Sequence, residues 1–191
     1  MQQREELEVY FAERVTTAVS NQGVALSEEG RGYLTDLLVR SAKAETHFQG
    51  EAPTTLAELH LQAAHSERGH ALSLYRRLGD RALFIAGWFS ESLERRAVGL
   101  SYYTDMGEAA YDRVAGLASS SPLRDWTELF GELARRFGEC VGVVAEVSEG
   151  DDEPQDSDVL RLYELWQKTR SPYAARRLAR LGILAAEGGA A

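Results

Sequence analysis

DRALFIAGWFSESLERRAV, residues 80–98, is the stretch from which the fold of this chain can be argued. On a helical wheel its apolar residues point nearly all the way round the helix: Leu83, Phe84, Ile85, Ala86, Trp88, Phe89, Leu93 and Ala97. A helix that is apolar on every side is normally buried on every side. The stretch is too short and too charged at its ends to cross a bilayer, which requires about 20 mostly apolar residues. It therefore predicts the buried central helix of an all-α protein.

Further helices are predicted around this one, because apolar residues recur at helical spacing between breaks rich in Gly, Pro and Ser. We expect a single-domain bundle of about six principal helices: residues 5–19, a segment after Ser27, and residues 55–78, 80–98, 102–118 and 123–147. The sequence Leu78-Gly79-Asp80 is interpreted as a helix stop followed by the N-cap of the next helix. Residues 1–148 would form the bundle core and residues 149–158, EGDDEPQDSD, an acidic linker. Residues 159–191 would form a C-terminal pair of helices packed on the bundle.

Composition narrows the classes of protein to which the chain can belong. A net charge of −9 opposes sequence-independent binding to nucleic acid, which needs excess cations to displace counterions from phosphates. The acidic start of the chain is unlike a signal peptide, and no apolar run reaches the length of a membrane span. The single cysteine, Cys140, fits a reducing compartment as a buried structural thiol. We expect a cytoplasmic protein that binds neither nucleic acid nor membrane.

The predicted helix over residues 55–78 carries ionisable side chains where burial is expected. His60 and Glu67 fall near the middle of its apolar face, and His70 falls towards the edge. Glu67 and His70 have the i, i+3 spacing that lets a carboxylate and an imidazole reach one metal ion from one helix. Glu45, on the inward face of the preceding helix, and Glu91, on the central helix, could add carboxylates. The five residues Glu45, His60, Glu67, His70 and Glu91 form a candidate site for iron or manganese.

This set is only half of a dinuclear carboxylate site, because such bundles supply a second Glu-x-x-His pair from another helix. All four histidines of this chain lie between residues 47 and 70. A single-metal site and, less favoured, haem ligation by His60 or His70 therefore stay open. The main alternative needs no metal: Arg113 could pair with Glu67 or Glu91 in a buried polar network in which a histidine donates a hydrogen bond. A misplaced helix phase would remove the cluster altogether.

The tyrosines Tyr102, Tyr103 and Tyr111 form a second polar group, near Asp105. They are interpreted as core residues whose hydroxyls reach the surface, with a ligand site as the alternative. The sequence contains no Gly-rich phosphate loop, no Ser/His/Asp set and no paired-cysteine motif. We therefore expect a non-enzymatic protein that acts through contacts with a protein partner, as an adaptor or regulatory subunit. The alternative is a metal-dependent oxidoreductase of the dinuclear carboxylate type, whose cofactor would be iron or manganese. Whether the chain is an enzyme, and its oligomeric state, are left open.

Overall fold

The computed structural model describes residues 2–45, 55–88, 99–119, 123–149 and 156–170, with 174–175, 178–179 and 182–183. These residues form eight α-helices and no strand, so the all-α class is confirmed for this part of the chain. The helices are α1 (Gln2–Gln22), α2 (Glu28–Glu45), α3 (Leu56–Ala64), α4 (Arg68–Trp88), α6 (Leu100–Ala118), α7 (Arg124–Arg135), α8 (Phe137–Glu149) and α9 (Asp156–Thr169).

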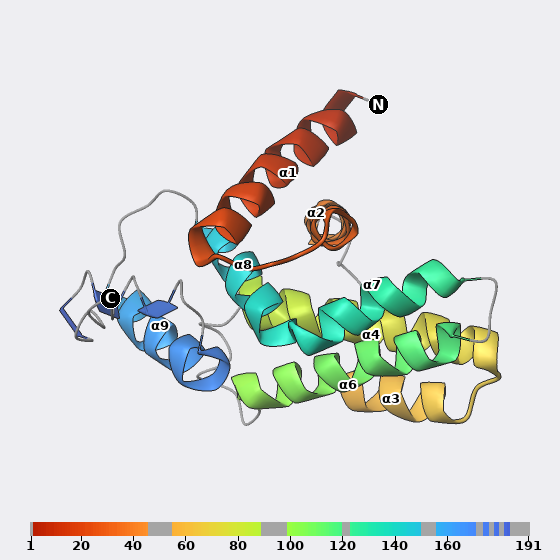
Figure 1. The fold of residues 1–191 in the computed structure, drawn as a ribbon. Helices are drawn as coiled ribbons and strands as arrows, with labels where there is room; N and C mark the ends of the chain where they lie inside the picture. The colour runs from red at the N-terminus through yellow and green to blue at the C-terminus, as the bar shows by residue number, and fades with distance from the viewer. Residues whose placement is uncertain are drawn as a thin grey trace.

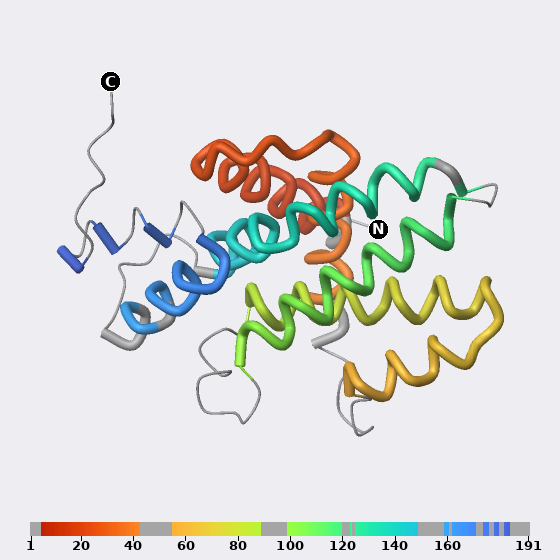
Figure 2. The backbone as a smooth tube through the Cα atoms, turned by 60° about the horizontal axis from the view of Figure 1, so that its bottom comes forward, coloured from red at the N-terminus to blue at the C-terminus, as the bar shows by residue number. Residues whose placement is uncertain are grey.

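The fold begins with two crossed helices, α1 and α2, which are called the α1–α2 pair (Figure 1). This pair packs through α1 against α8 and through α2 against α4 and α7. A helical hairpin, α3 and α4, follows; α6 packs beside α4, and α7 packs on α6 (Figure 2). The bent helix is α7 with α8, and α9 packs against α8 and α6. The neighbours of α4 are therefore α2, α3, α6 and α8.

The helix break near the middle of the chain lies at residues 65–67 and not at Gly79 as predicted. At this break the Ser66 hydroxyl donates to the Gln62 carbonyl at 2.7 Å, which satisfies one carbonyl in the last turn of α3. α4 continues through Gly79 because this glycine admits a neighbouring ring. A Cβ at Gly79 would lie 2.4 Å from Cε1 of Tyr111 on α6. The glycine thus serves close packing between helices, and Asp80 is an interior residue of α4 instead of an N-cap.

The prediction that residues 80–98 form the buried central helix is not confirmed, whereas part of α8 is buried on all sides. Six consecutive residues of α8, Cys140 to Ala145, are buried. In the predicted central stretch Leu83 and Ala86 are fully buried but Phe84, Ile85 and Trp88 are partly exposed, and residues 89–98 lie outside the described part. The rule that an all-round apolar helix is an interior helix holds. In the described residues this burial falls in the second half of the predicted helix over residues 123–147.

A bend at Arg136 divides those residues into α7 and α8, where the backbone leaves helical geometry at φ −109° and ψ 21°. Beyond the bend the Phe137 ring packs directly on Gly107 of α6, where a Cβ would lie 2.0 Å from Cζ. The two halves consequently have different surroundings: α7 packs beside α6, whereas α8 passes through the interior. This division is also why the predicted count of about six principal helices is not confirmed, since the break at residues 65–67 only moves the boundary between two predicted helices.

The predicted linker falls largely outside the described residues. α8 ends at Glu149, α9 begins at Asp156, and residues 150–155 between them lie outside the described part. Of the predicted C-terminal pair, α9 packs on the bundle through Leu162 and Leu165, which are fully buried. None of the helices in the described part of the chain combines the length and the apolar character needed to cross a membrane.

Candidate functional site

The predicted metal ligands face solvent wherever the structure describes their side chains. His60 lies on α3, Glu67 in the turn between α3 and α4, and His70 in the first turn of α4; all three are exposed. The prediction that His60 and Glu67 lie on a buried face is therefore wrong. Its cause is the break at residues 65–67, because a wheel drawn across two helices averages two different apolar faces. His60 packs instead at the edge of the core, with its ring centroid 5.8 Å from that of Tyr75.

The remaining two candidate ligands are not placed: the side chain of Glu45, at the end of α2, and the whole of Glu91 lie outside what the structure describes. Within the described ranges, no three or more His, Cys, Asp or Glu side chains are gathered so that they could hold a metal ion. The five-residue metal site therefore stays a prediction. The alternative pairing does not form with Glu67, because Arg113 and Glu67 are both exposed and no ion pair joins these two described residues.

The structure instead places a buried carboxylate at Asp80, which is only 7% exposed. Two tyrosine hydroxyls donate to its Oδ1: that of Tyr33 on α2 at 2.5 Å and that of Tyr111 on α6 at 2.8 Å. Its Oδ2 accepts from the guanidinium of Arg40 on α2 at 3.1 Å, and Nε of Arg76 lies 3.8 Å away. A buried charge needs paired and hydrogen-bonded surroundings, and here both oxygens have them. Asp80 thus joins α2, α4 and α6.

Aromatic rings surround this carboxylate and close it from solvent. The ring of Phe130 on α7 lies 5.1 Å from that of Tyr33 and 5.2 Å from that of Tyr111, centroid to centroid. On the outer side the Arg76 guanidinium lies over the Trp126 ring, 5.3 Å from its centroid. Such edge and cation–π contacts contribute about 0.5–1.5 kcal/mol each beyond simple burial. α7 is thereby added to the three helices that Asp80 joins.

The electrostatics of the cluster keep its hydroxyls protonated. Burial, followed by the negative charge of Asp80, raises the pKa of Tyr111 well above its ordinary value. The same two causes, with the hydrogen bond to Asp80, raise the pKa of Tyr33. Burial by itself would lower the pKa of the Arg40 guanidinium, but Asp80 and Asp36 outweigh it and raise that pKa. Both tyrosines therefore act as donors and Arg40 stays charged, which is the arrangement of a structural tie and not of a proton-transfer site.

Sequence reasoning missed this cluster, although two of its signals were present. Asp80 stands inside a strongly apolar stretch, and Tyr111 falls on the predicted inward face of residues 102–118. The prediction that tyrosine hydroxyls of this group reach the surface is wrong for Tyr111, which is fully buried. Nothing local connects Asp80 with Tyr33 and Arg40, because these residues are 47 and 40 positions apart in the chain.

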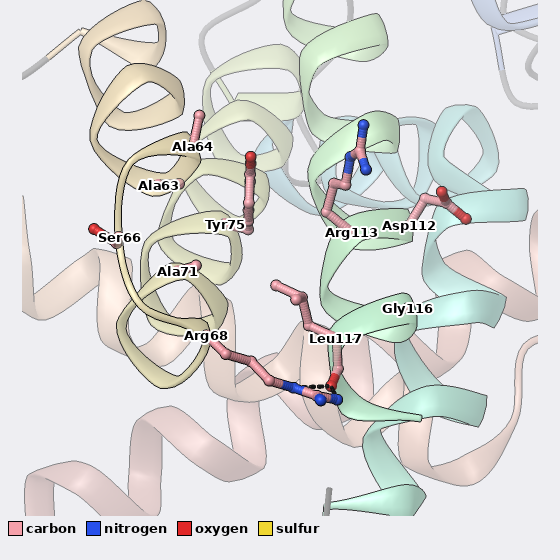
Figure 3. Close-up of a pocket in the computed structure, with 10 residues that line it drawn as sticks. All are labelled: Ala63, Ala64, Ser66, Arg68, Ala71, Tyr75, Asp112, Arg113, Gly116 and Leu117. Carbon is pink, nitrogen blue, oxygen red and sulfur yellow. Dashed lines mark hydrogen bonds between the residues drawn. The ribbon is translucent and has the colours of Figure 1, made fainter. Parts of the chain in front are cut away.

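An open groove lies between the α3–α4 hairpin and α6 (Figure 3). Its volume is about 480 Å³, within the size range typical of ligand clefts. Small and apolar residues form about half of its lining, and polar or charged residues form the other half; the lining residues are Ala63, Ala64, Ser66, Arg68, Ala71, Tyr75, Asp112, Arg113, Gly116 and Leu117.

At one end of the groove the Arg68 guanidinium donates to the Leu117 carbonyl through Nε, at 3.1 Å, and through a terminal nitrogen (Figure 3). This contact ties the start of α4 to the last turn of α6, where a carbonyl without a helical partner is available. It also links α4 and α6 at this end of the groove. Arg113 and Asp112 stand on α6 and are exposed.

Two features of the molecule are therefore candidates for function: the closed Asp80 cluster and the open groove. Both carboxylate oxygens of Asp80 have hydrogen-bond partners inside the protein, whereas the groove is open to solvent. Comparison of the chain with known protein families, with curated proteins and with solved structures found no match.

Proposed function

We propose that this protein acts through contacts with another protein, as a non-enzymatic adaptor or regulatory subunit, and that the groove between the α3–α4 hairpin and α6 is its contact surface. The observation that carries the proposal is the lining of the groove. Protein interfaces combine an apolar centre with a polar rim. Here the exposed Ala64 and the half-buried Leu117 supply apolar surface, and the exposed Arg113 and Asp112 supply charge.

The size of the lining side chains favours a polypeptide over a compact small molecule as the occupant. Alanine and glycine at positions 63, 64, 71 and 116 leave room for a neighbouring backbone to approach closely. Recognition of a helix in a groove uses such surfaces, with apolar anchors spaced three and four residues apart. Leu61, one turn before Ala64 on α3, extends the apolar surface beyond the groove itself.

A site-specific photo-crosslink in the cells that make this protein tests the proposal. A benzophenone amino acid at Ala64, in the groove, is expected to give a covalent adduct with one defined protein. The same amino acid at Gly32 is the control, because Gly32 lies on α2 and has open space around it. With the purified pair, Ala64→Arg is expected to weaken binding by about tenfold or more. Equal adducts at both positions, or none at Ala64, would rule the groove out as the contact surface.

A further inference from the structure

The polar half of the groove contains a buried tyrosine whose hydroxyl is free to bind a ligand. Tyr75 lies on α4 and is only 8% exposed, and its ring packs against that of His60 on α3. It lines the groove, and no hydrogen bond joins its hydroxyl to another described residue. Buried tyrosines usually have a partner for the hydroxyl. This unpartnered hydroxyl in an open groove therefore marks a position for a hydrogen-bonding ligand.

A guanidinium on the opposite side of the groove can reach the same ligand. Arg113 lies on α6 and is exposed, and no hydrogen bond or ion pair joins it to another described residue. Its guanidinium and the Tyr75 hydroxyl point towards the same end of the groove, the upper end in Figure 3. The neighbouring Asp112 carboxylate points away from the α3–α4 hairpin (Figure 3). α4 and α6 thus each contribute one available donor.

From these two side chains we propose that the segment of the partner protein in this groove carries a carboxylate, which accepts from the Tyr75 hydroxyl and pairs with the Arg113 guanidinium. The proposal rests on the proposed function, since it names the chemistry of the partner at that same surface. A phenol supplies one O–H donor and a guanidinium several N–H donors, so the pair can satisfy both oxygens of a carboxylate. An acidic residue of the partner segment would supply this group.

The charges of the lining favour a carboxylate over a phosphate or a cation. Two of the three charged lining residues are arginines, although the chain as a whole has a net charge of −9. Arg68, at the other end of the groove, already donates to the Leu117 carbonyl. Among the described lining residues this leaves the one positive charge of Arg113, which matches a carboxylate, whereas a phosphate group carries nearly two negative charges. The distant acidic residues act weakly here, because salt screens exposed charges beyond about 8 Å.

Binding of a small carboxylate to the full-length chain tests the site before the partner is known. The probe is isocaproate, which has a leucine-like carbon skeleton and one carboxylate, and the control is the uncharged isocaproamide. We expect isocaproate to shift the amide resonances of Ala64 and Gly116 in the groove but not that of Gly32 on α2, with a dissociation constant of about 1–10 mM. The amide is expected to bind at least about fivefold more weakly. Equal binding of the two compounds, or no shift in the groove, overturns the proposal.

Two substitutions test the residues themselves. Tyr75→Phe removes only the hydroxyl and Arg113→Gln only the charge, and each is expected to weaken isocaproate binding at least about threefold. Arg77→Gln is the matched control, because Arg77 is an exposed arginine of α4 that does not line the groove. Since the Tyr75 hydroxyl has no partner to lose, the urea midpoint of Tyr75→Phe is expected to match that of the unchanged chain. Equal effects of Arg77→Gln and Arg113→Gln, or unchanged binding in Tyr75→Phe, overturn the site.

The photo-crosslink at Ala64 separates this proposal from the proposed function. Loss of the adduct in Arg113→Gln, but not in Arg77→Gln, supports both. An adduct with one defined protein that is unchanged in Arg113→Gln overturns the carboxylate and leaves the groove as a contact surface. Isocaproate binding that depends on Tyr75 and Arg113, without any adduct at Ala64, overturns the contact with a polypeptide and assigns the site to a free carboxylic acid.

Discussion

Asp80 shows how much of this fold depends on single polar residues. Two tyrosines and an arginine from two other helices depend on its carboxylate as acceptor. Removing one member of a buried charged cluster leaves the others without partners, which is more costly than the cluster is stabilising. The residue that sequence reasoning treats as a helix cap is in fact the polar centre of four packed helices.

We predict that Asp80→Ala lowers the free energy of unfolding by about 3–5 kcal/mol, because the buried Tyr111 hydroxyl and the part-buried Tyr33 hydroxyl lose their acceptor and Arg40 loses one of its two carboxylate partners. Tyr111→Phe, which removes one donor, is expected to cost about 1–3 kcal/mol. Asp36→Asn is the control: Asp36 bonds the same Arg40 at 2.8 Å, but its side chain is 50% exposed. An exposed pair contributes only about 0–1 kcal/mol. Urea unfolding measures all three, and equal losses for Asp80→Ala and Asp36→Asn would contradict the structural role.

A second residue-scale prediction concerns alkaline pH. Burial, then the charges of Glu139 and Glu132, raises the pKa of Cys140 from 9.0 to about 12, and burial also raises that of Tyr111. In the unfolded chain these groups ionise near their ordinary pKa values, so the unfolded state loses protons first as pH rises. The contribution of each group to stability is therefore complete below its ordinary pKa, about 9 for Cys140 and about 10 for Tyr111. Above that pH it declines by about 1.4 kcal/mol per pH unit for each group.

The measurement is the urea midpoint between about pH 8 and about pH 11. We expect the midpoint to fall above pH 9, and to fall less steeply in Cys140→Ala than in the unchanged chain. An identical decline in the two proteins would show that Cys140 does not titrate on unfolding. The same burial predicts that Cys140 reacts with thiol reagents only after unfolding, because the thiolate is the nucleophile.

At the scale of elements, the α1–α2 pair is attached to the rest of the bundle by three acidic residues. Asp80 of α4 accepts from Tyr33 and Arg40, as above. Glu132 of α7 accepts from the Ser27 backbone N–H at 2.9 Å and from its hydroxyl at 2.5 Å. Glu146 of α8 accepts from the side chains of Asn21 at 2.7 Å and Gln22 at 2.9 Å. In each case residues of the α1–α2 pair and its connecting loop donate the hydrogen bonds, and a carboxylate of the bundle accepts them.

This arrangement predicts that the α1–α2 pair opens as a unit. Glu146→Gln is expected to raise the rate of amide hydrogen exchange in α1 and α2 by about tenfold while leaving the rate in α4 and α6 unchanged. The reason is that it weakens a charge-assisted contact made by the α1–α2 pair alone. Glu139→Gln is the matched control, because Glu139 is also on α8 but pairs with Arg136 of its own segment at 2.7 Å. Faster exchange throughout the chain in Glu146→Gln would show that the α1–α2 pair does not open separately.

At the scale of the whole molecule, the proposed contact function and the alternative metal enzyme predict different metal contents for the purified protein. If the protein acts through its groove alone, protein purified without chelator is expected to carry much less than one iron, manganese or zinc per chain. The metal hypothesis expects a near-stoichiometric ion that is lost in Glu67→Ala with His70→Ala. Elemental analysis separates the two. Bound metal that those substitutions remove would overturn the non-enzymatic proposal.

Local pattern determined the secondary structure of this chain. Helix formation depends on contacts three and four residues apart, so spacing alone predicted the helical regions around residues 5–19, 102–118 and 123–147, and the burial of Cys140. The same pattern could not separate a glycine that ends a helix from one that admits a ring, and Gly79 was assigned to the wrong role for that reason. Nor could it tell which of two apolar stretches is central.

Tertiary structure alone decided the interior and the sites. α8 is buried because α1, α4 and α9 pack around it. Asp80 is tied to Tyr33 and Arg40 only because α2 crosses α4, and the groove exists only because α6 lies beside the α3–α4 hairpin. Contacts between residues far apart in the chain depend on how helices pack, and helical periodicity carries no information about that packing.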